Sequence, residues 1–189
     1  MLKLNLGCFD KKLPGFTNID IRPECNPDVI DNAFTLETIK DDSVDLIYCC
    51  HMLEHLSYEE SQQALKVWYK KLKKGGILRL AVPNLEKACS LYLLTRNKNL
   101  IKSMFWGSQR HEFDYHKNGW SFGDLYGELQ KAGFGKIMTY EWQDVEPHNY
   151  IDDYSQSYWP PMHKKHKCAN GEEIDFGGQL LSLNVEATK

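Results

Sequence analysis

The sequence lacks an apolar stretch long enough to cross a membrane. Nowhere in its 189 residues do apolar side chains approach the roughly 20 in a row that a bilayer-spanning helix needs. Residues 1–10 already have the pattern of a strand and a turn, without a basic segment followed by an apolar one. A secretory signal peptide is therefore not expected, and we expect a cytoplasmic protein.

The sequence also lacks a strong excess of charge of either sign. Its formal net charge is −3, whereas nucleic-acid-binding domains usually carry a marked excess of lysine and arginine. We therefore expect no nucleic-acid partner.

Metal-binding spacings of cysteine and histidine are missing as well. None of the six cysteines forms a Cys-x-x-Cys pair, and free thiols are the default in a reducing compartment. His163, His166 and Cys168 lie close together in the chain, but His-x-x-His-x-Cys matches no closed zinc pattern, and a fourth ligand is not evident. We therefore expect no bound metal.

What the chain does contain is enough apolar side chains for one core. Hydrophobic residues make up 42% of it, which suits a single domain over residues 1–189. Segments with the pattern of strands are residues 2–7, 16–21, 28–31, 44–50, 77–82, 136–142 and 179–187. Segments with the pattern of helices are residues 57–76, 85–96 and 121–133.

The order of these segments predicts the fold class. Strands that alternate with helices indicate an α/β fold with a mainly parallel sheet. Only 11 residues run from Gly7 to Thr17, close to the lower limit for a parallel crossover. The helices around the first three strands are therefore expected to be reduced or missing.

The helix expected over residues 57–76 has clear signals at both ends. Ser57 with Glu60 three residues later forms a capping-box pattern, and Gly75 with Gly76 is expected to end the helix. Its expected inner face carries apolar side chains at helical spacing. These are Leu65, Trp68, Tyr69 and Leu72.

Polar residues follow the first three expected strands. Ligands of such sheets bind at the carboxyl ends of the strands, where Gly7 lets the backbone approach a ligand closely. Asp20 could accept both hydroxyl groups of a ribose, and Asp31 or Asn32 could bond an adenine amino group. A glycine turn or a solvated acid is common without a ligand. The prediction of a ligand site therefore rests on the occurrence of these residues in order after three successive strands.

Five segments in this order resemble the class I S-adenosylmethionine (SAM)-dependent methyltransferases, closest to a small bacterial branch of that family. The segments are LNLGC (4–8), FTNID (16–20), DSVDLIY (42–48), HMLEHL (51–56) and LKKGGILRLAVPN (72–84). The resemblance covers about residues 2–86. It implies a Rossmann-like, seven-stranded sheet with an antiparallel last strand, and SAM as cofactor.

The resemblance also implies which residues bind the cofactor. The methionine part would lie against Gly7 and its neighbours, the ribose against Asp20, and the adenine near Asp31 or Asn32. His51 would form the floor below the sulfonium. The full expected set is Asn5, Gly7, Cys8, Asp20, Ile21, Asp31, Asn32, His51 and Leu53. Glu54 and His55 lie at a helix start, which favours a capping or packing role for them.

Phe9 is a departure from the family pattern. It stands where the glycine-rich turn usually has a second glycine, so its ring either covers part of the cofactor or packs inward. This difference also supports an alternative, a non-catalytic scaffold that kept the fold. An NAD-dependent oxidoreductase is disfavoured, because Gly7 is not followed by Gly-x-x-Gly.

Two downstream segments rich in aromatic residues are expected to close the site. They cover about residues 106–120 and 140–178. Many relatives close the site with helices that precede the first strand, and we expect the downstream segments to take that role here. His116 and His111 in the first segment are the candidate catalytic bases. The alternative is that both segments form a small satellite core. By analogy with relatives, the acceptor is expected to be a small molecule, such as a sugar or a cell-envelope precursor.

Overall fold

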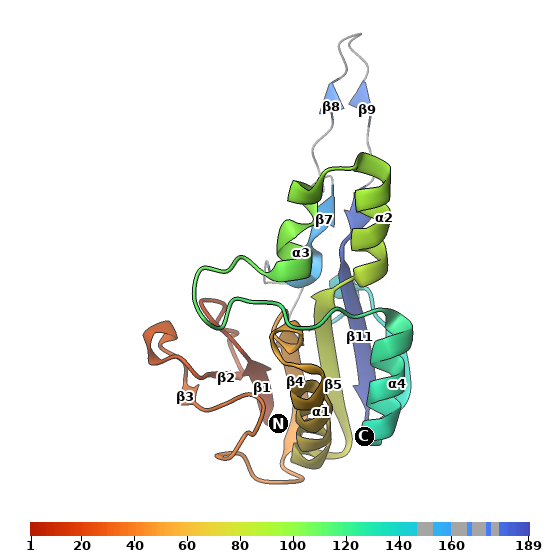
Figure 1. Ribbon diagram of the computed structural model, residues 1–189. Coiled ribbons are helices and arrows are strands. Elements are labelled where there is room, and N and C mark those ends of the chain that lie inside the picture. The colour runs from red at the N-terminus through yellow and green to blue at the C-terminus, as the bar shows by residue number, and fades with distance from the viewer. Residues whose placement is uncertain (147–152, 160–165, 168–172, 175–177) are drawn as a thin grey trace.

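A mixed seven-stranded sheet runs through the computed structural model (Figure 1). The structure describes residues 1–146, 153–159, 166–167, 173–174 and 178–189. The strands of the sheet are β1 (Lys3–Leu6), β2 (Thr17–Asp20), β3 (Val29–Ile30), β4 (Val44–Cys50), β5 (Leu72–Pro83), β6 (Gly135–Thr139) and β11 (Ser182–Thr188). Two short pairs lie outside it: β7 (Tyr158–Trp159) with β10 (Gln179–Leu180), and β8 (His166–Lys167) with β9 (Glu173–Ile174).

The strand order creates a crevice at one end of the sheet. The order is β3-β2-β1-β4-β5-β11-β6; the strands from β3 to β5 pair in parallel, and β11 is antiparallel to both of its neighbours. The chain runs outward from β1 to β3 and returns to β4 on the other side of β1. Such a reversal leaves a binding crevice at the carboxyl ends of the strands. The expected α/β fold with an antiparallel last strand is confirmed.

The helices are distributed unevenly along the chain. The α-helices are α1 (Tyr58–Lys71), α2 (Leu85–Thr95), α3 (Lys102–Trp106) and α4 (Phe122–Ala132). The 3-10 helices are η1 (Pro23–Cys25), η2 (Leu53–His55), η3 (Lys98–Leu100), η4 (Trp142–Asp144) and η5 (Tyr154–Gln156). Between β1 and β4, a stretch described in full, η1 is the only helix. The expected reduction of helices near the first three strands is therefore confirmed.

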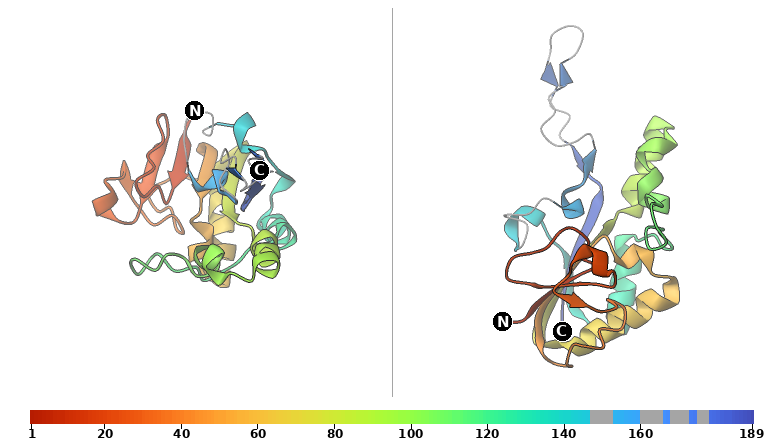
Figure 2. Two further views of the ribbon diagram at one scale, coloured as in Figure 1. Left: turned by 90° about the horizontal axis from the view of Figure 1, so that it is seen from above. Right: turned by 90° about the vertical axis from the view of Figure 1, so that its left-hand side faces the viewer.

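Helices α1 and α4 cover one face of the sheet, as the edge-on view shows (Figure 2). The capping box of α1 is present: the Glu60 N–H donates to Ser57 Oγ, and the Ser57 N–H donates to Glu60 Oε2. Leu65 and Trp68 are fully buried on the inner side of α1, as expected. The Trp68 indole N–H donates to the Ala33 carbonyl at 2.7 Å, which fixes the loop after β3.

On the opposite face of the sheet, no α-helix of the described residues lies over β1 and β4, and loops cover these strands. Leu13 and Phe16, from the connection between β1 and β2, pack there against Leu46 and Tyr48. Asp153 beside η5 lies on the same side and accepts a hydrogen bond from the Tyr48 hydroxyl at 2.5 Å. One face therefore has a helical core and the other a small core made by loops.

The end of α1 differs from the expectation. The helix ends at Lys71, and β5 begins at the next residue, so Gly75 and Gly76 lie inside the strand. A Cβ at Gly76 would lie 2.8 Å from the Lys73 carbonyl oxygen and 3.1 Å from that of Val44, which is too close. The glycine pair therefore permits the irregular pairing between β4 and β5 instead of ending the helix.

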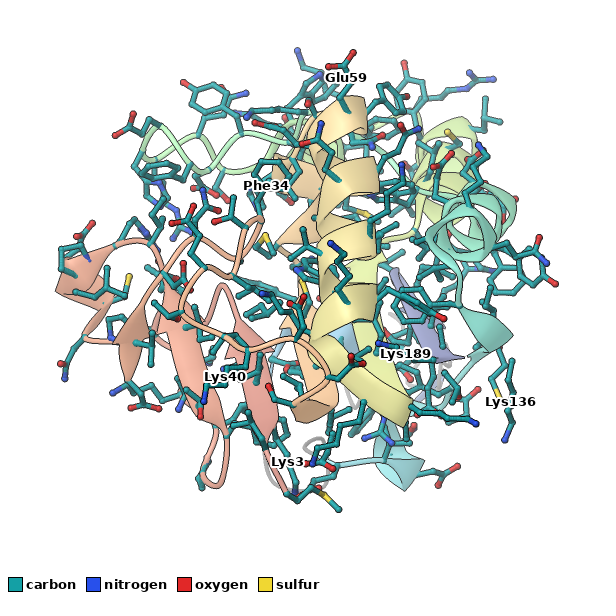
Figure 3. The ribbon with its side chains drawn as sticks, turned by 90° about the horizontal axis from the view of Figure 1, so that it is seen from below. Lys3, Phe34, Lys40, Glu59, Lys136 and Lys189 are labelled. Atoms are coloured by element: carbon teal, nitrogen blue, oxygen red, sulfur yellow. The ribbon has the colours of Figure 1, made fainter. Side chains whose placement is uncertain are left out.

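The last residue of the chain stabilises this junction. Lys189 Nζ donates to the Leu72 carbonyl at 2.7 Å and contacts Asp42 Oδ1 at 2.6 Å. In the view from below, Lys189 and Lys40 lie on opposite sides of α1 (Figure 3). The carboxyl end of α1 is thus held by a cation, as the dipole of a helix favours.

Two expected strands have different limits in the structure. The segment 179–187 is divided into β10 and β11, which belong to different sheets, and the segment 136–142 is shorter, because residues 142–144 form η4. Leu181 lies at the division and is buried against α2 and η3 in a separate cluster of apolar side chains. Within the described part of the chain, no helix is long and apolar enough to span a bilayer.

Candidate cofactor and acceptor site

A cavity of about 540 Å³ lies at the carboxyl ends of β1, β2 and β4. This is within the range of roughly 300–1,000 Å³ found for small-molecule sites. Residues 103–117, the lid segment, border it on one side and overlap the expected lid 106–120. From the other expected lid, 140–178, Asp153, Tyr154 and Ser157 border the cavity, and much of the remainder lies outside the described residues.

The first wall of the cavity, the strand-end wall, consists of residues at the carboxyl ends of β1 and β2 and in the loops that follow β1, β2 and β3. Gly7 begins its first turn with a φ of +64°, and a Cβ there would lie 2.6 Å from Met52 Cγ. Phe9 has a φ of +43°, a conformation that glycine adopts at far lower cost. The backbone at this position therefore has the conformation that the glycine of the family pattern would adopt, although the residue here is Phe9.

Asp20 fixes this turn from the end of β2. Its side chain is almost fully buried, and its two oxygens accept hydrogen bonds from the Phe9 N–H at 2.9 Å and the Arg22 N–H at 3.0 Å. A carboxylate has about four lone-pair positions, so Asp20 can still accept hydroxyl groups from the cavity it borders. The same residue thus shapes the glycine turn and presents an acceptor to a ligand.

The lid segment contacts the strand-end wall through cations and rings. The Arg22 guanidinium carbon lies 4.9 Å from the centre of the Phe9 ring, and that of Arg110 lies 6.0 Å from it. Arg22 Nη1 lies 2.9 Å from His111 Nε2, and Arg110 Nε lies 2.9 Å from Asp114 Oδ2. The Phe9 ring therefore lies near two arginines, one of which belongs to the lid segment.

Most of the cofactor residues expected from the sequence border the cavity. Those that do are Asn5, Gly7, Cys8, Asp20, Ile21, Asn32 and His51. Asp31 and Leu53 are not among its lining residues: Asp31 Oδ2 accepts from the Thr38 backbone N–H and hydroxyl, and Leu53 is fully buried in the core. Burial raises the pKa of the Cys8 thiol to about 12, so it stays protonated near neutral pH.

The second wall, the histidine wall, consists of His51, Glu54, His55 and His116. His51 follows β4 in a left-handed conformation with a φ of +49°, and its N–H donates to the Ala81 carbonyl at 2.7 Å. Strained backbone of this kind persists only where the surroundings fix it and is common at functional sites. Burial lowers the pKa of His51 to about 3, so its ring is neutral.

Glu54 is the most unusual residue of the histidine wall. Its side chain is 1% exposed, and neither carboxyl oxygen has a hydrogen-bond partner among the residues that the structure describes. Burial raises its pKa to about 8. His51 Nδ1 and His116 Nε2 lie 3.5 Å and 3.8 Å from Glu54 Oε1. Because burial lowers the pKa of both histidines, these contacts are not ion pairs between charged groups near pH 7.

The lid segment brings His116 into this wall and takes His111 elsewhere. His116 Nδ1 lies 2.9 Å from the Met104 carbonyl, which accepts its N–H, so Nε2 carries the lone pair. His111 Nε2 faces the guanidinium of Arg22, which can only donate, so its lone pair is already used there. Of the two candidate bases, His116 is the one with a free lone pair.

Sequence reasoning assigned Glu54 and His55 to capping or packing. In the structure both belong to η2, yet Glu54 caps nothing and His55 lies with His116 at the cavity, their ring centres 4.7 Å apart. The spacing His-x-x-Glu-His over 51–55 is the sequence signal that could have indicated this cluster.

Comparisons with known proteins agree with this geometry. Residues 17–80 match a family model described as a methyltransferase domain. No curated protein matches the chain in sequence.

Solved structures with a similar fold are SAM-dependent methyltransferases of low sequence identity. One from Thermotoga maritima, described as a possible histamine N-methyltransferase, has a TM-score of 0.59 at 17% identity, over 100% of this chain and 82% of its own. One from Methanosarcina mazei has a TM-score of 0.58 at 16% identity, covering 99% and 91%. One from Archaeoglobus fulgidus has a TM-score of 0.57 at 14% identity, covering 99% and 85%.

The chain therefore has the fold of these SAM-dependent methyltransferases, and residues 17–80 are similar to a methyltransferase domain.

Proposed function

We propose that the chain transfers a methyl group from SAM to a small acceptor that binds beside the histidine wall. The observation that carries this is the shared cavity: the strand-end wall and the histidine wall face one space of about 540 Å³. That volume suits a nucleoside-sized cofactor beside a small molecule. The suggestion of a sugar or a cell-envelope precursor comes from the family resemblance alone, and the expected cytoplasmic location stays a prediction.

The strand-end wall fits SAM. Gly7 keeps the first turn close to β4, Asp20 offers a buried carboxylate at the cavity, and Asn32 and Phe34 add an amide and an aromatic side chain beside it. These groups match what the hydroxyls of a ribose and a flat base need. When bound, SAM supplies a methyl group on a positively charged sulfur, which is already activated for transfer.

The protein's own residues must then position the acceptor and exclude water. The lid segment borders the cavity and contacts the strand-end wall through Arg22 and His111. His116 has a neutral ring with Nε2 free, so it can take a proton from an acceptor hydroxyl or amine. His116 is therefore our proposed acceptor-side residue, ahead of His111.

Binding of S-adenosylhomocysteine, the demethylated product, tests the cofactor assignment. A ligand that binds only the folded state raises the melting temperature once its concentration exceeds the dissociation constant. We expect such a rise with S-adenosylhomocysteine and none with NADH at the same concentration. The absence of a shift at millimolar S-adenosylhomocysteine, with the protein folded, would contradict the assignment. Binding without turnover across a panel of small acceptors would favour the alternative of a non-catalytic scaffold.

A further inference from the structure

The histidine wall contains a buried carboxylate that no group in the described part of the chain satisfies. Both oxygens of Glu54 lack a hydrogen-bond partner, although the side chain is only 1% exposed. A buried polar group without a partner costs roughly 1–3 kcal/mol, and a charged one costs more. Native proteins seldom keep such a group unless it serves an ion, a water or a reaction.

Two imidazoles, those of His55 and His116, lie beside this carboxylate. His116 Nδ1 lies 2.9 Å from the Met104 carbonyl and His55 Nδ1 lies 3.2 Å from the Tyr115 carbonyl. A carbonyl only accepts, so each Nδ1 carries the hydrogen and each Nε2 carries the lone pair. Histidines that bind metals are oriented in this way, with the second ring nitrogen donating to a carbonyl or carboxylate.

The three ligand atoms are already close to one another. One atom each from Glu54, His55 and His116 lies within 4.8 Å of the other two. Ligands about 2.1 Å from a zinc ion lie about 3.4 Å apart in a tetrahedral site, so small side-chain rotations would complete it.

The backbone holds this cluster together across a long stretch of sequence. The N–H groups of Lys117 and Asn118 both donate to the Glu54 carbonyl, at 2.9 Å and 3.1 Å. Lys117, which directly follows His116 in the chain, is therefore hydrogen-bonded to the backbone of Glu54. Preorganised spacing of this kind is what a binding site requires, and a chance contact between surface groups lacks it.

We propose that Glu54, His55 and His116 bind one divalent transition-metal ion at the edge of the cavity. Two imidazole nitrogens and one carboxylate oxygen suit zinc and its neighbours, whereas magnesium and calcium prefer oxygen ligands throughout. Three protein ligands leave a fourth position open, as in catalytic zinc sites. His51 Nδ1, 3.5 Å from Glu54 Oε1, lies next to the site.

The position of this site gives the metal a role that rests on the proposed function. All three ligands line the cavity in which the acceptor would bind. A metal there can hold an acceptor oxygen and lower the pKa of a bound hydroxyl, which favours its attack on a methyl group. In the metal-bound protein His116 would then be a ligand, and the metal would take over the task proposed for its lone pair.

Metal titration of the purified full chain tests the proposal directly. After treatment with a chelator, the protein is titrated with Zn²⁺ by calorimetry and with Co²⁺ by visible absorption. We expect one equivalent of either ion to bind, with a Co²⁺ spectrum of a four- or five-coordinate nitrogen and oxygen site. A large excess of Mg²⁺ should not compete. E54Q, H55A and H116A should each weaken binding at least about a hundredfold, since each removes one ligand.

Two matched variants separate this site from other histidines. H111A removes a ring from the same lid segment but outside the cluster, and it should bind Zn²⁺ like the wild type. A triple variant of His163, His166 and Cys168 should also keep full binding. Circular dichroism without metal checks that each variant folds; should E54Q fail to fold, the more exposed His55 still provides the test.

Two results would overturn the proposal. One is well below one equivalent of Zn²⁺ in the folded wild type, and the other is loss of the metal in the triple variant with retention in H116A. S-adenosylhomocysteine binding, measured on the same samples, keeps the two proposals apart. Cofactor binding without metal binding would refute only the metal site, whereas metal binding without cofactor binding would refute only the proposed function.

Discussion

The two walls of the cavity are built in opposite ways. The strand-end wall comes mainly from residues 5–34, close in sequence, and its key contact joins Phe9 to Asp20, 11 positions apart. The histidine wall joins Glu54 to His116 from the far end of the lid segment. The first wall uses backbone N–H groups and a satisfied carboxylate, and the second uses neutral imidazoles around an unsatisfied one.

This contrast indicates a division of work between the walls. A wall whose polar groups are already satisfied is rigid before the ligand arrives, which suits a cofactor that is the same in every turnover. A wall with an unpaired carboxyl and free lone pairs can instead bind a group that carries its own charge or proton, such as a metal ion or the acceptor. Variants in the two walls should therefore affect different quantities.

The largest expected effect is in the strand-end wall. Asp20→Ala should weaken S-adenosylhomocysteine binding by about 1–3 kcal/mol, or about five- to 150-fold, since a charged hydrogen-bond partner is removed. Asp20→Asn should cost less, because an oxygen acceptor remains. Calorimetric titration measures both values.

Asp45→Ala is the control for this prediction. Asp45 is a carboxylate at the opposite end of β4, where it pairs with Lys73. Its loss should leave S-adenosylhomocysteine affinity unchanged. Equal affinities for Asp20→Ala and the wild type would show that the strand-end wall does not bind the ribose.

The strand-end wall is also the part of the site that sequence reasoning predicts best. Gly7, Asp20 and Asn32 each lie at or just after the end of a short strand, and the carboxyl ends of parallel strands meet at one edge of a sheet. Asp31 is the exception within this set. Its carboxylate closes the loop onto Thr38, a local bond that strand order does not determine.

The histidine wall could not be predicted in the same way. Which histidine of the lid segment faces Glu54 depends on how that segment packs over the sheet, and no periodic pattern encodes this. His111 and His116 were equal candidates by spacing, yet one meets Arg22 and the other meets Glu54. The prediction that Gly75 and Gly76 end the helix was wrong for a related reason. Gly76 permits a close strand contact with Val44, and local helix-ending rules do not include such contacts.

The second prediction concerns turnover and lies in the histidine wall. His116→Ala should leave S-adenosylhomocysteine affinity nearly unchanged and lower the methylation rate at least about tenfold, whether the ring acts as a base or as a metal ligand. The two measurements are a binding titration and a rate with the methyl acceptor once one is identified. A joint fall of cofactor affinity and melting temperature would instead make His116 a structural residue.

The smallest expected effect concerns Phe9, whose ring lies near Arg22 of the strand-end wall and Arg110 of the lid segment. Phe9→Gly removes the cost of a side chain at a φ of +43°, but it also loses the ring that Arg22 and Arg110 face. A left-handed non-glycine residue costs roughly 1–2 kcal/mol, and an exposed cation–π contact contributes about 0.5–1 kcal/mol, so the two changes nearly cancel. We expect S-adenosylhomocysteine affinity within about threefold of the wild type by the same free-energy scale.

Phe9→Val, which loses the ring and keeps a β-branched residue at positive φ, should lower the melting temperature and bind more weakly than Phe9→Gly. If Phe9→Gly instead loses binding as severely as Asp20→Ala, the ring itself forms part of the cofactor site, and the strand-end wall is not complete without the side chain that the family pattern replaces with glycine.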